Sequence, residues 1–165
     1  MAEKEKLLEL KNVVYSFHTY GGEVKAVRDV SFEVRKGEIL GIVGESGCGK
    51  SVTAQCIMRL NPEPPGFFEG GEILFNGKDV LKMDKKELRQ LRGGDIGFVF
   101  QDPMTSLNPT MRVGAQIEEV FIGRAGVSKK EVKEKALEIM KLVGISDVEK
   151  RYRQDRKSTR LNSSH

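Results

Sequence analysis

The sequence predicts an α/β protein, and two observations carry the prediction. Residues 7–17 and 24–34 are rich in β-branched and aromatic side chains and alternate roughly between apolar and polar positions, which is typical of an antiparallel strand pair. Residues 39–44 form a short apolar run, and a glycine-rich turn joins them to residues 50–60, where apolar side chains recur at helical spacing. A strand pair followed by a strand, a turn and a helix favours a fold that mixes antiparallel and parallel strands with helices.

Length and composition fit one globular domain. The chain has 165 residues, of which 38% are hydrophobic and 32% are charged, as in soluble proteins with a moderate core. No stretch approaches the ~18 consecutive apolar residues of a membrane span. The N-terminal sequence MAEKEKLLEL is charged from its third residue and lacks the apolar segment of a signal peptide.

Cysteine and charge content exclude two further classes of protein. Cys48 and Cys56 are too few for a disulfide framework and suit a reducing cytosol. The 28 Lys and Arg residues against 24 Asp and Glu residues give a net charge of +4, which is too mild for a dedicated nucleic-acid binder. We therefore expect no nucleic-acid partner.

The C-terminal segment DRKSTRLNSSH differs from the rest of the chain. Residues 155–165 are polar, show no apolar periodicity and match the translation of a common short-read sequencing adapter. We therefore expect an adapter-derived tail that takes no part in the fold, and a partial domain over residues 1–154.

Local signals predict a hairpin and a helix in the middle of the chain. Asn76-Gly77 lies between short strand-like pieces of residues 72–80, which is a strong hairpin signal. Asp84 begins a capping-box pattern, so a short helix is expected to about Arg92, ended by Gly93-Gly94.

The last third of the chain predicts one more strand and mostly helices. Like residues 39–44, residues 96–100 are continuously apolar, which suits a strand buried on both faces; left uncovered, such runs favour aggregation. A loop over residues 101–110 and a helix over 113–124 are expected next. A further helix is capped by Ser128 and ended by Gly144, and a last helix begins at Ser146. The apolar residues on one face of the helix capped by Ser128 are Val132, Ala136, Ile139, Met140 and Val143.

Residues 44–51, GESGCGKS, match the phosphate-binding motif G-x-x-x-x-G-K-[S/T] in full, between an apolar run and a helix. The glycines allow the backbone to curl so that successive N–H groups point inward, and the helix N-terminus adds a partial positive charge. Lys50 is expected to reach the β- and γ-phosphates, and the Ser51 hydroxyl to bind Mg²⁺. Cys48 fills a position where a small side chain suffices, and Glu45 is expected to point outward because a carboxylate would repel phosphate.

Longer strings give the sequence a more specific resemblance. Residues 30–51 and the string FVFQDP at residues 98–103 resemble the phosphate loop and Q-loop of ABC transporter ATPases, with the same order of parts from about residue 7 to residue 154. GIVGESGCGKSVT and FQDPMTSLNP are similar to the dipeptide, oligopeptide and nickel importer branch. The resemblance implies a P-loop NTPase of the ABC type, with a β subdomain and P-loop core over residues 1–100 and the start of a helical subdomain over 101–154.

The resemblance also implies roles for individual residues. Gln101 would contact Mg²⁺ and the attacking water, and Lys50 and Gln101 would be the catalytic residues of this segment. Ser51 and Gln101 would be the metal ligands. The ATP phosphates would be bound by Gly44, Glu45, Ser46, Gly47, Cys48, Gly49, Lys50, Ser51 and Val52.

Two assignments leave an alternative open. In this family an aromatic residue of the first strand stacks on adenine, and the resemblance places Phe17 there. Tyr20 in the adjoining loop is the alternative stacking residue. Phe17 would also suit a position in the hydrophobic core. The loop after Gln101 would face the membrane subunits, and packing inside the domain explains its apolar residues almost as well; these are Met104, Leu107, Pro109 and Met111.

The family's signature segment LSGGQ, its Walker B aspartate, the following glutamate and the switch histidine do not occur in residues 1–154. The expected function is that of an ATP-hydrolysing subunit of a peptide-type ABC importer, in a segment that is inactive alone. The implied cofactors are ATP and Mg²⁺, and the implied partners are a second ATPase subunit, transmembrane permease subunits and, indirectly, a solute-binding protein. The implied location is peripheral, on the cytoplasmic face of the plasma (inner) membrane.

Two other functions remain as alternatives. Another kind of P-loop protein, such as a small kinase or GTPase, is disfavoured because no N-K-x-D guanine motif occurs and a strand pair precedes the phosphate loop. A nucleotide-binding module that never hydrolyses its ligand is the other alternative.

Overall fold

The computed structural model describes residues 5–102, 106–122 and 128–155. It divides the chain into two compact units, Met1–Gly97 and Phe98–His165. We describe each unit by itself.

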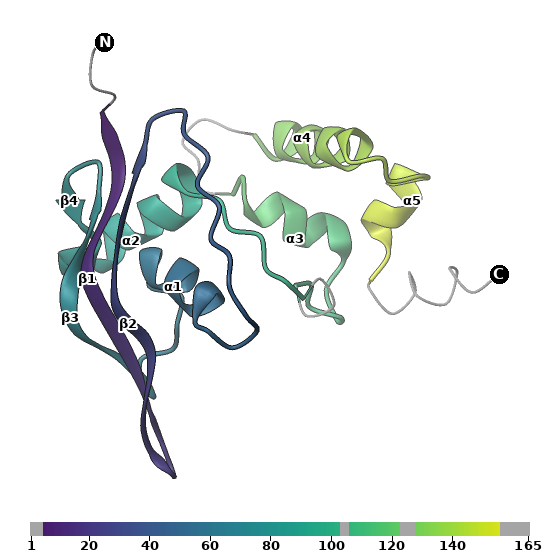
Figure 1. Ribbon diagram of the computed structural model, residues 1–165. Helices are drawn as coiled ribbons and strands as arrows, with labels where there is room; N and C mark the ends of the chain where they lie inside the picture. The colour runs from purple at the N-terminus through teal and green to yellow at the C-terminus, as the bar shows by residue number, and fades with distance from the viewer. Residues whose placement is uncertain (1–4, 103–105, 123–127, 156–165) are drawn as a thin grey trace. The chain divides into compact units, whose positions relative to one another are not determined.

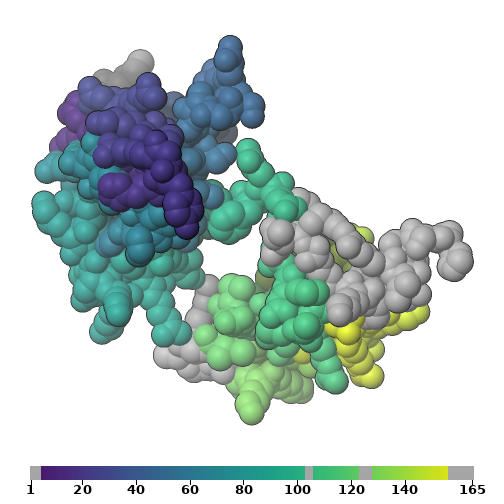
Figure 2. Space-filling view, turned by 90° about the horizontal axis from the view of Figure 1, so that it is seen from below, coloured from purple at the N-terminus to yellow at the C-terminus, as the bar shows by residue number. Residues whose placement is uncertain are grey.

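The first unit contains a four-stranded antiparallel sheet with the strand order β2-β1-β3-β4 (Figure 1). Its two long strands, β1 (Lys6–Thr19) and β2 (Gly22–Arg35), form the hairpin that the alternating segments predict. They extend further than predicted, because Thr19 pairs with Gly22 and leaves only a two-residue turn. The space-filling view shows the purple β1–β2 segment in direct contact with the teal β3–α2 segment (Figure 2).

A second hairpin completes the sheet. β3 (Gly66–Phe75) pairs with β1, and the short β4 (Lys78–Asp79) turns back on β3. Asn76 and Gly77 between them have φ angles of 48° and 76°, the left-handed conformation that an Asn-Gly hairpin turn requires. The Asn-Gly prediction is therefore confirmed.

One face of this sheet carries the core. Inward-facing side chains of β1, β2 and β3 meet Cys56 of helix α1 (Lys50–Ile57) and two residues that follow β4. Each apolar side chain of this size contributes roughly 1.5–3 kcal/mol when it leaves water. The buried cluster consists of Leu10, Val13, Tyr15, Val27, Cys56, Ile73, Val80 and Leu91.

Three short helical elements follow the sheet. They are the 3₁₀ turn η1 (Val80–Lys82), helix α2 (Lys85–Gln90) and the π-helical turn η2 (Leu91–Asp95). Asp84 and Glu87 form the predicted capping box at the start of α2. The expectation that Gly93-Gly94 ends this helix is wrong, because the chain continues as a π turn in which the Ile96 N–H bonds to the Leu91 carbonyl.

The second unit is helical where it is described. It contains α3 (Val113–Glu119), α4 (Lys129–Leu142) and α5 (Val148–Arg153). The capping box at Ser128 is confirmed, with Ser128 and Glu131 bonding reciprocally. Two expectations need correction: α3 ends before residue 124, and Asp147, not Ser146, is the N-cap of α5.

Tyr152 of α5 packs against α3 in the second unit. Its ring packs so closely on Gly114 of α3 that a Cβ there would lie 2.4 Å from the ring, and its hydroxyl donates to Glu118. Val132, Ala136 and Met140 of α4 are buried as predicted. Ile139 and Val143, predicted on the same face, are exposed because no described element covers that side of α4.

The two continuous apolar runs do not form strands. Residues 39–44 and 96–100 have no strand assignment, and Ile39 and Val99 are 97% and 95% exposed. A strand of a parallel sheet needs hydrogen-bonding neighbours on its edges and cover on both faces, and no described segment pairs with either run. The prediction of two buried strands is therefore wrong for this chain, and the aggregation expected of uncovered runs stays a prediction.

The described residues contain no membrane-spanning helix, and the expected tail begins with a residue that contacts the second unit. Among the described residues, no helix combines the length and the apolar character needed to cross a membrane. Asp155, the first residue of the expected tail, forms an isolated bridge with Arg112, and residues 156–165 lie outside the described residues.

Candidate functional site

The predicted phosphate loop lies at the N-terminus of α1. Gly47 and Gly49 have φ angles of 81° and 93°, and Gly49 is the left-handed N-cap of the helix. The Thr53 N–H and hydroxyl both donate to the Gly49 carbonyl, at 2.8 and 2.9 Å, and fix the turn to the helix. The glycine spacing therefore performs the predicted task of curling the backbone in front of a helix.

Gly49 also permits a close approach of two backbone segments. A Cβ at this position would lie 2.2 Å from the Ala26 carbonyl oxygen of β2. The loop therefore rests directly on a strand of the sheet. Sequence reasoning missed this role of Ala26, because nothing in the motif marks the strand residue that faces its third glycine.

Replacing Gly49 by alanine is expected to destabilise the first unit by about 3 kcal/mol, since the side chain meets both a left-handed φ and a backbone oxygen. Urea unfolding followed by circular dichroism measures the change. Gly41→Ala is the matched control, because Gly41 has no positive φ and a Cβ there meets nothing within 4 Å. Equal midpoints for the two variants would contradict the close approach.

The Lys50 side chain turns back into the loop. Its ammonium donates to the carbonyl oxygens of Gly44 at 2.8 Å and Glu45 at 2.6 Å, and lies 3.5 Å from Cys48 Sγ. The loop thus holds a positive charge at its centre, on acceptors that belong to its own backbone. The Lys50 ammonium is therefore placed where it could bind a phosphate group held by the loop.

The electrostatics of the helix start also favour an anion. The first turn of α1 contains no acidic residue, and no side chain caps its N-terminus. The partial positive charge of the helix end is therefore not neutralised by a carboxylate within that turn. Ser51 is exposed in the same turn and Val52 is half-buried behind it.

Cys48 and Cys56 differ sharply in exposure. Cys48 is exposed beside Lys50, whereas Cys56 is fully buried and accepts a hydrogen bond from Asn61 at 3.2 Å. Burial raises the pKa of the Cys56 thiol to about 12. A thiol reagent is therefore expected to react at Cys48 first.

We expect ATP to slow the modification of Cys48 by a maleimide, because bound phosphates and the thiol share the loop. Mass spectrometry of timed reactions measures the rate, and Cys56 is the internal control because it should stay unlabelled in the folded chain. Equal labelling rates with and without ATP would place the nucleotide elsewhere.

The two candidates for adenine stacking lie in different environments. Phe17 is half-buried, packs against the core and meets Tyr15 edge to face at 5.3 Å between ring centroids. Tyr20 is fully exposed in the turn between β1 and β2. Phe17 thus packs against the core, as the sequence allowed. That Phe17 rather than Tyr20 stacks on adenine stays a prediction.

Gln101 lies in the second unit and is exposed. Its approach to the phosphate loop, and with it the proposed metal ligand pair, stays a prediction. Within the described part of the chain no group of three or more His, Cys, Asp or Glu side chains is arranged to hold a metal ion. A metal at this site would therefore depend on hydroxyl, amide and phosphate oxygens.

The loop after Gln101 is held by a side chain of α3. Gln116 accepts from the Asn108 N–H at 2.8 Å and donates to the Asn108 and Met111 carbonyl oxygens at 3.1 and 3.2 Å. Met111 is 40% exposed and Pro109 is exposed, whereas Leu107 is half-buried. Met104 lies outside the described residues.

Comparison with known proteins identifies the family of the chain. The sequence matches the ABC transporter family over residues 27–161. It is 56% identical over 154 residues to the oligopeptide transport ATP-binding protein OppD of Bacillus subtilis, covering 93% of this chain and 43% of that protein. It is 51% identical over 150 residues to the dipeptide transport ATP-binding protein DppD of Lactococcus lactis, covering 90% of this chain and 42% of that protein. The chain thus spans less than half the length of these relatives.

Solved structures give the same result. The ATP-binding cassette MJ0796, a dimer bound to ADP and Pi in a post-hydrolysis state, has a TM-score of 0.76 and 26% identity, with 92% of this chain and 62% of that chain covered. A second dimeric structure of MJ0796 has a TM-score of 0.75. The expected α/β fold of the ABC ATPase type and the resemblance to peptide transport ATP-binding proteins are confirmed. The chain belongs to the ABC transporter family.

Proposed function

We propose that the chain is the N-terminal part of the ATP-binding and ATP-hydrolysing subunit of an ABC importer for peptides or similar solutes. The observation that carries the proposal is the phosphate loop with Lys50 held at its centre by the Gly44 and Glu45 carbonyls. The names of relatives at 56% and 51% identity support the peptide class of solute.

In the proposed reaction Lys50 exchanges its backbone acceptors for the β- and γ-phosphate oxygens of ATP. The loop N–H groups and the start of α1 hold the remaining phosphate charge. Mg²⁺, where bound, neutralises charge that develops on the phosphates, and the Ser51 hydroxyl and Gln101 amide oxygen are the hard donors that suit it. Gln101 would also orient the attacking water.

The proposed partners are a second ATPase subunit, membrane-spanning permease subunits and, through them, a solute-binding protein. The dimeric state of the MJ0796 cassette supports the first of these. The transport names of the relatives support peripheral placement at the cytoplasmic face of the plasma (inner) membrane.

A phosphate-release assay on two proteins tests the proposal: the 165-residue chain and the longer protein encoded by the complete gene. We expect the longer protein to hydrolyse ATP cooperatively at about 1 s⁻¹ or faster. The 165-residue chain should release phosphate no faster than buffer, because its sequence contains neither the signature segment nor the catalytic glutamate that follows the Walker B aspartate.

Lys50→Ala in the longer protein is the control for contaminating ATPase. Steady, Lys50-dependent turnover by the 165-residue chain would show that the catalytic groups have been misplaced. ATP binding without turnover by the longer protein would instead favour a nucleotide-binding module.

A further inference from the structure

The C-terminal end of α1 has an uncommon cap. The Arg59 N–H bonds to the Cys56 carbonyl at 3.0 Å, and the Leu60 N–H bonds to the Gln55 carbonyl at 2.9 Å. This pair of bonds closes a helix with one left-handed residue, which is usually glycine. Here the left-handed residue is Arg59, with φ of 50°, so the cap carries a backbone strain that glycine would avoid.

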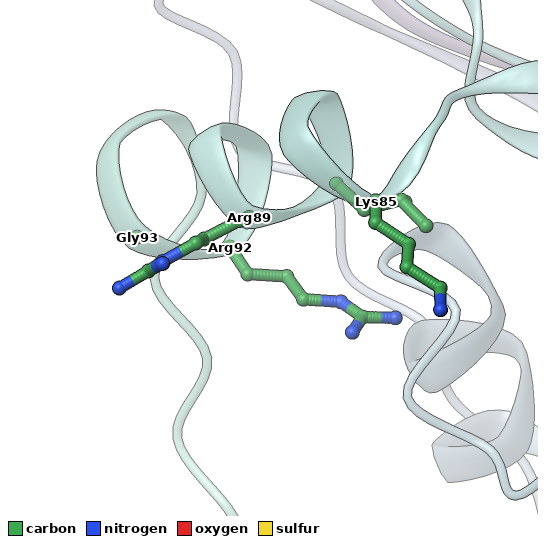
Figure 3. A pocket seen from close by; sticks show the side chains of 5 residues that line it. Lys85, Arg89, Arg92 and Gly93 are labelled. Carbon is green, nitrogen blue, oxygen red and sulfur yellow. The ribbon is translucent and has the colours of Figure 1, made fainter.

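A second arginine holds the carbonyls that this cap turns outward. Arg92 Nε donates to the Met58 carbonyl oxygen at 2.8 Å, and another guanidinium nitrogen donates to the Arg59 carbonyl oxygen. Arg92 lines a groove of about 400 Å³ with Lys85, Leu88, Arg89 and Gly93. Figure 3 shows the Arg92 and Arg89 side chains running in opposite directions from the same helical segment.

We propose that Arg92 is a positioning residue for the phosphate loop, an inference that rests on the proposed ATP-binding function. The guanidinium of Arg92 acts on the carbonyl end of α1, and the loop lies at the opposite end of the same eight-residue helix. By holding the Arg59 cap in place, Arg92 stabilises α1 as far as its first turn, and so keeps Lys50 at its position in the phosphate loop.

Charge and length explain why this contact reaches the loop. The last turn of α1 contains no basic residue, so Arg92 supplies from another element the cation that favours a helix C-terminus. An eight-residue helix has only about two turns, and helices this short are marginal by themselves, so the loss of one end weakens the whole helix. At that other end Thr53 bonds to Gly49 of the loop.

The contact also ties the carbonyl end of α1 to the π turn η2. Arg92 belongs to the π turn η2, and residues 96–101 follow directly. Wide turns of this kind occur often at functional sites. Sequence reasoning identified neither the cap nor the contact, because Arg92 is read there only as the last residue of a short helix.

Three variants of the 165-residue chain test the proposal. Arg92→Gln removes the charge and the paired donors, and Arg92→Lys keeps the charge alone. Arg89→Gln is the matched control, because the Arg89 side chain of α2 points in the opposite direction from that of Arg92 (Figure 3). Asn61 still donates to the Val52 carbonyl at 3.2 Å and to Cys56, so the variants are expected to fold.

Amide hydrogen exchange of residues 50–58 without nucleotide and calorimetry with ATP are the two measurements. We expect Arg92→Gln to speed the exchange about ten-fold and to weaken ATP binding about five-fold, because a charged hydrogen-bond pair is lost. Arg92→Lys should recover part of both effects, and Arg89→Gln should change neither.

Arg59→Gly in the Arg92→Gln background separates the proposed role from a general loss of stability. Glycine relieves the left-handed strain, so the double variant should regain slow exchange in α1 and most of its ATP affinity. Unchanged exchange in Arg92→Gln, or no recovery in the double variant, would overturn the proposal. If the exchange follows expectation but the parent chain binds no ATP, the positioning of α1 stands and the ATP-binding function is overturned for this chain.

Discussion

Substituting alanine for Lys50 is expected to weaken ATP binding by about 100-fold. The lysine is expected to contribute charge-assisted bonds to the β- and γ-phosphates, and bonds of this kind are worth about 1.5–3 kcal/mol each. A loss near 3 kcal/mol corresponds to roughly two orders of magnitude in Kd. Isothermal titration with ATP measures the change.

Lys130→Ala is the matched control for the removal of a positive charge. The Lys130 side chain is 87% exposed on α4 and lies 4.0 Å from a Glu134 carboxylate oxygen. Its loss should leave the affinity within the error of the titration. Equal affinities of the Lys50→Ala variant and the parent would show that the loop does not bind the nucleotide phosphates.

The second large effect is expected on self-association. Ile39 and Val43 are 97% and 93% exposed, and Leu40 and Ile42 are 41% and 44% exposed, in an uncharged segment without strand partners. Such a segment offers unpaired backbone and apolar side chains to a second copy. We expect Val43→Lys to abolish the concentration-dependent association of the parent chain in sedimentation velocity.

A lysine placed on a paired strand separates this effect from simple gain of charge. Val24 of β2 is 52% exposed, and its backbone is paired with Phe17. Val24→Lys should therefore associate like the parent chain. A monomeric parent at all concentrations would show that residues 39–43 are protected in solution.

Sequence signals that act within a few residues predicted the turns and most helix caps of this structure. Predictions that depended on contacts between distant segments failed. Asn76-Gly77, the capping boxes at Asp84 and Ser128, and the glycines of the phosphate loop act through neighbours a few residues away. Each of these predictions is confirmed, because turn and cap geometry depends on residues within the same short segment.

The failed predictions of burial share one cause. The strand prediction for residues 39–44 depended on partners distant in sequence, and the burial of Ile139 and Val143 depended on an element that would cover α4. Apolar character shows that a segment requires cover and does not identify the cover. The contact of Arg92 was missed for a related reason, because its acceptor on Met58 lies more than thirty residues earlier in the chain.

At the candidate site the motif predicted the residues but not their free arrangement. The sequence assigned Lys50 to phosphate and could not indicate that its ammonium bonds to the Gly44 and Glu45 carbonyls. The close approach of Gly49 to Ala26 was equally invisible, because it joins a loop to a strand that the chain has already left.

The bonds of Lys50 to its own loop make nucleotide binding an exchange reaction. The Lys50 ammonium has two carbonyl partners at 2.8 and 2.6 Å, which the β- and γ-phosphates of ATP would replace. The measured heat of binding therefore reports the difference between two sets of bonds. Because these two bonds restrict the Lys50 side chain, ATP binding would carry a smaller ordering cost than it would with a freely rotating lysine.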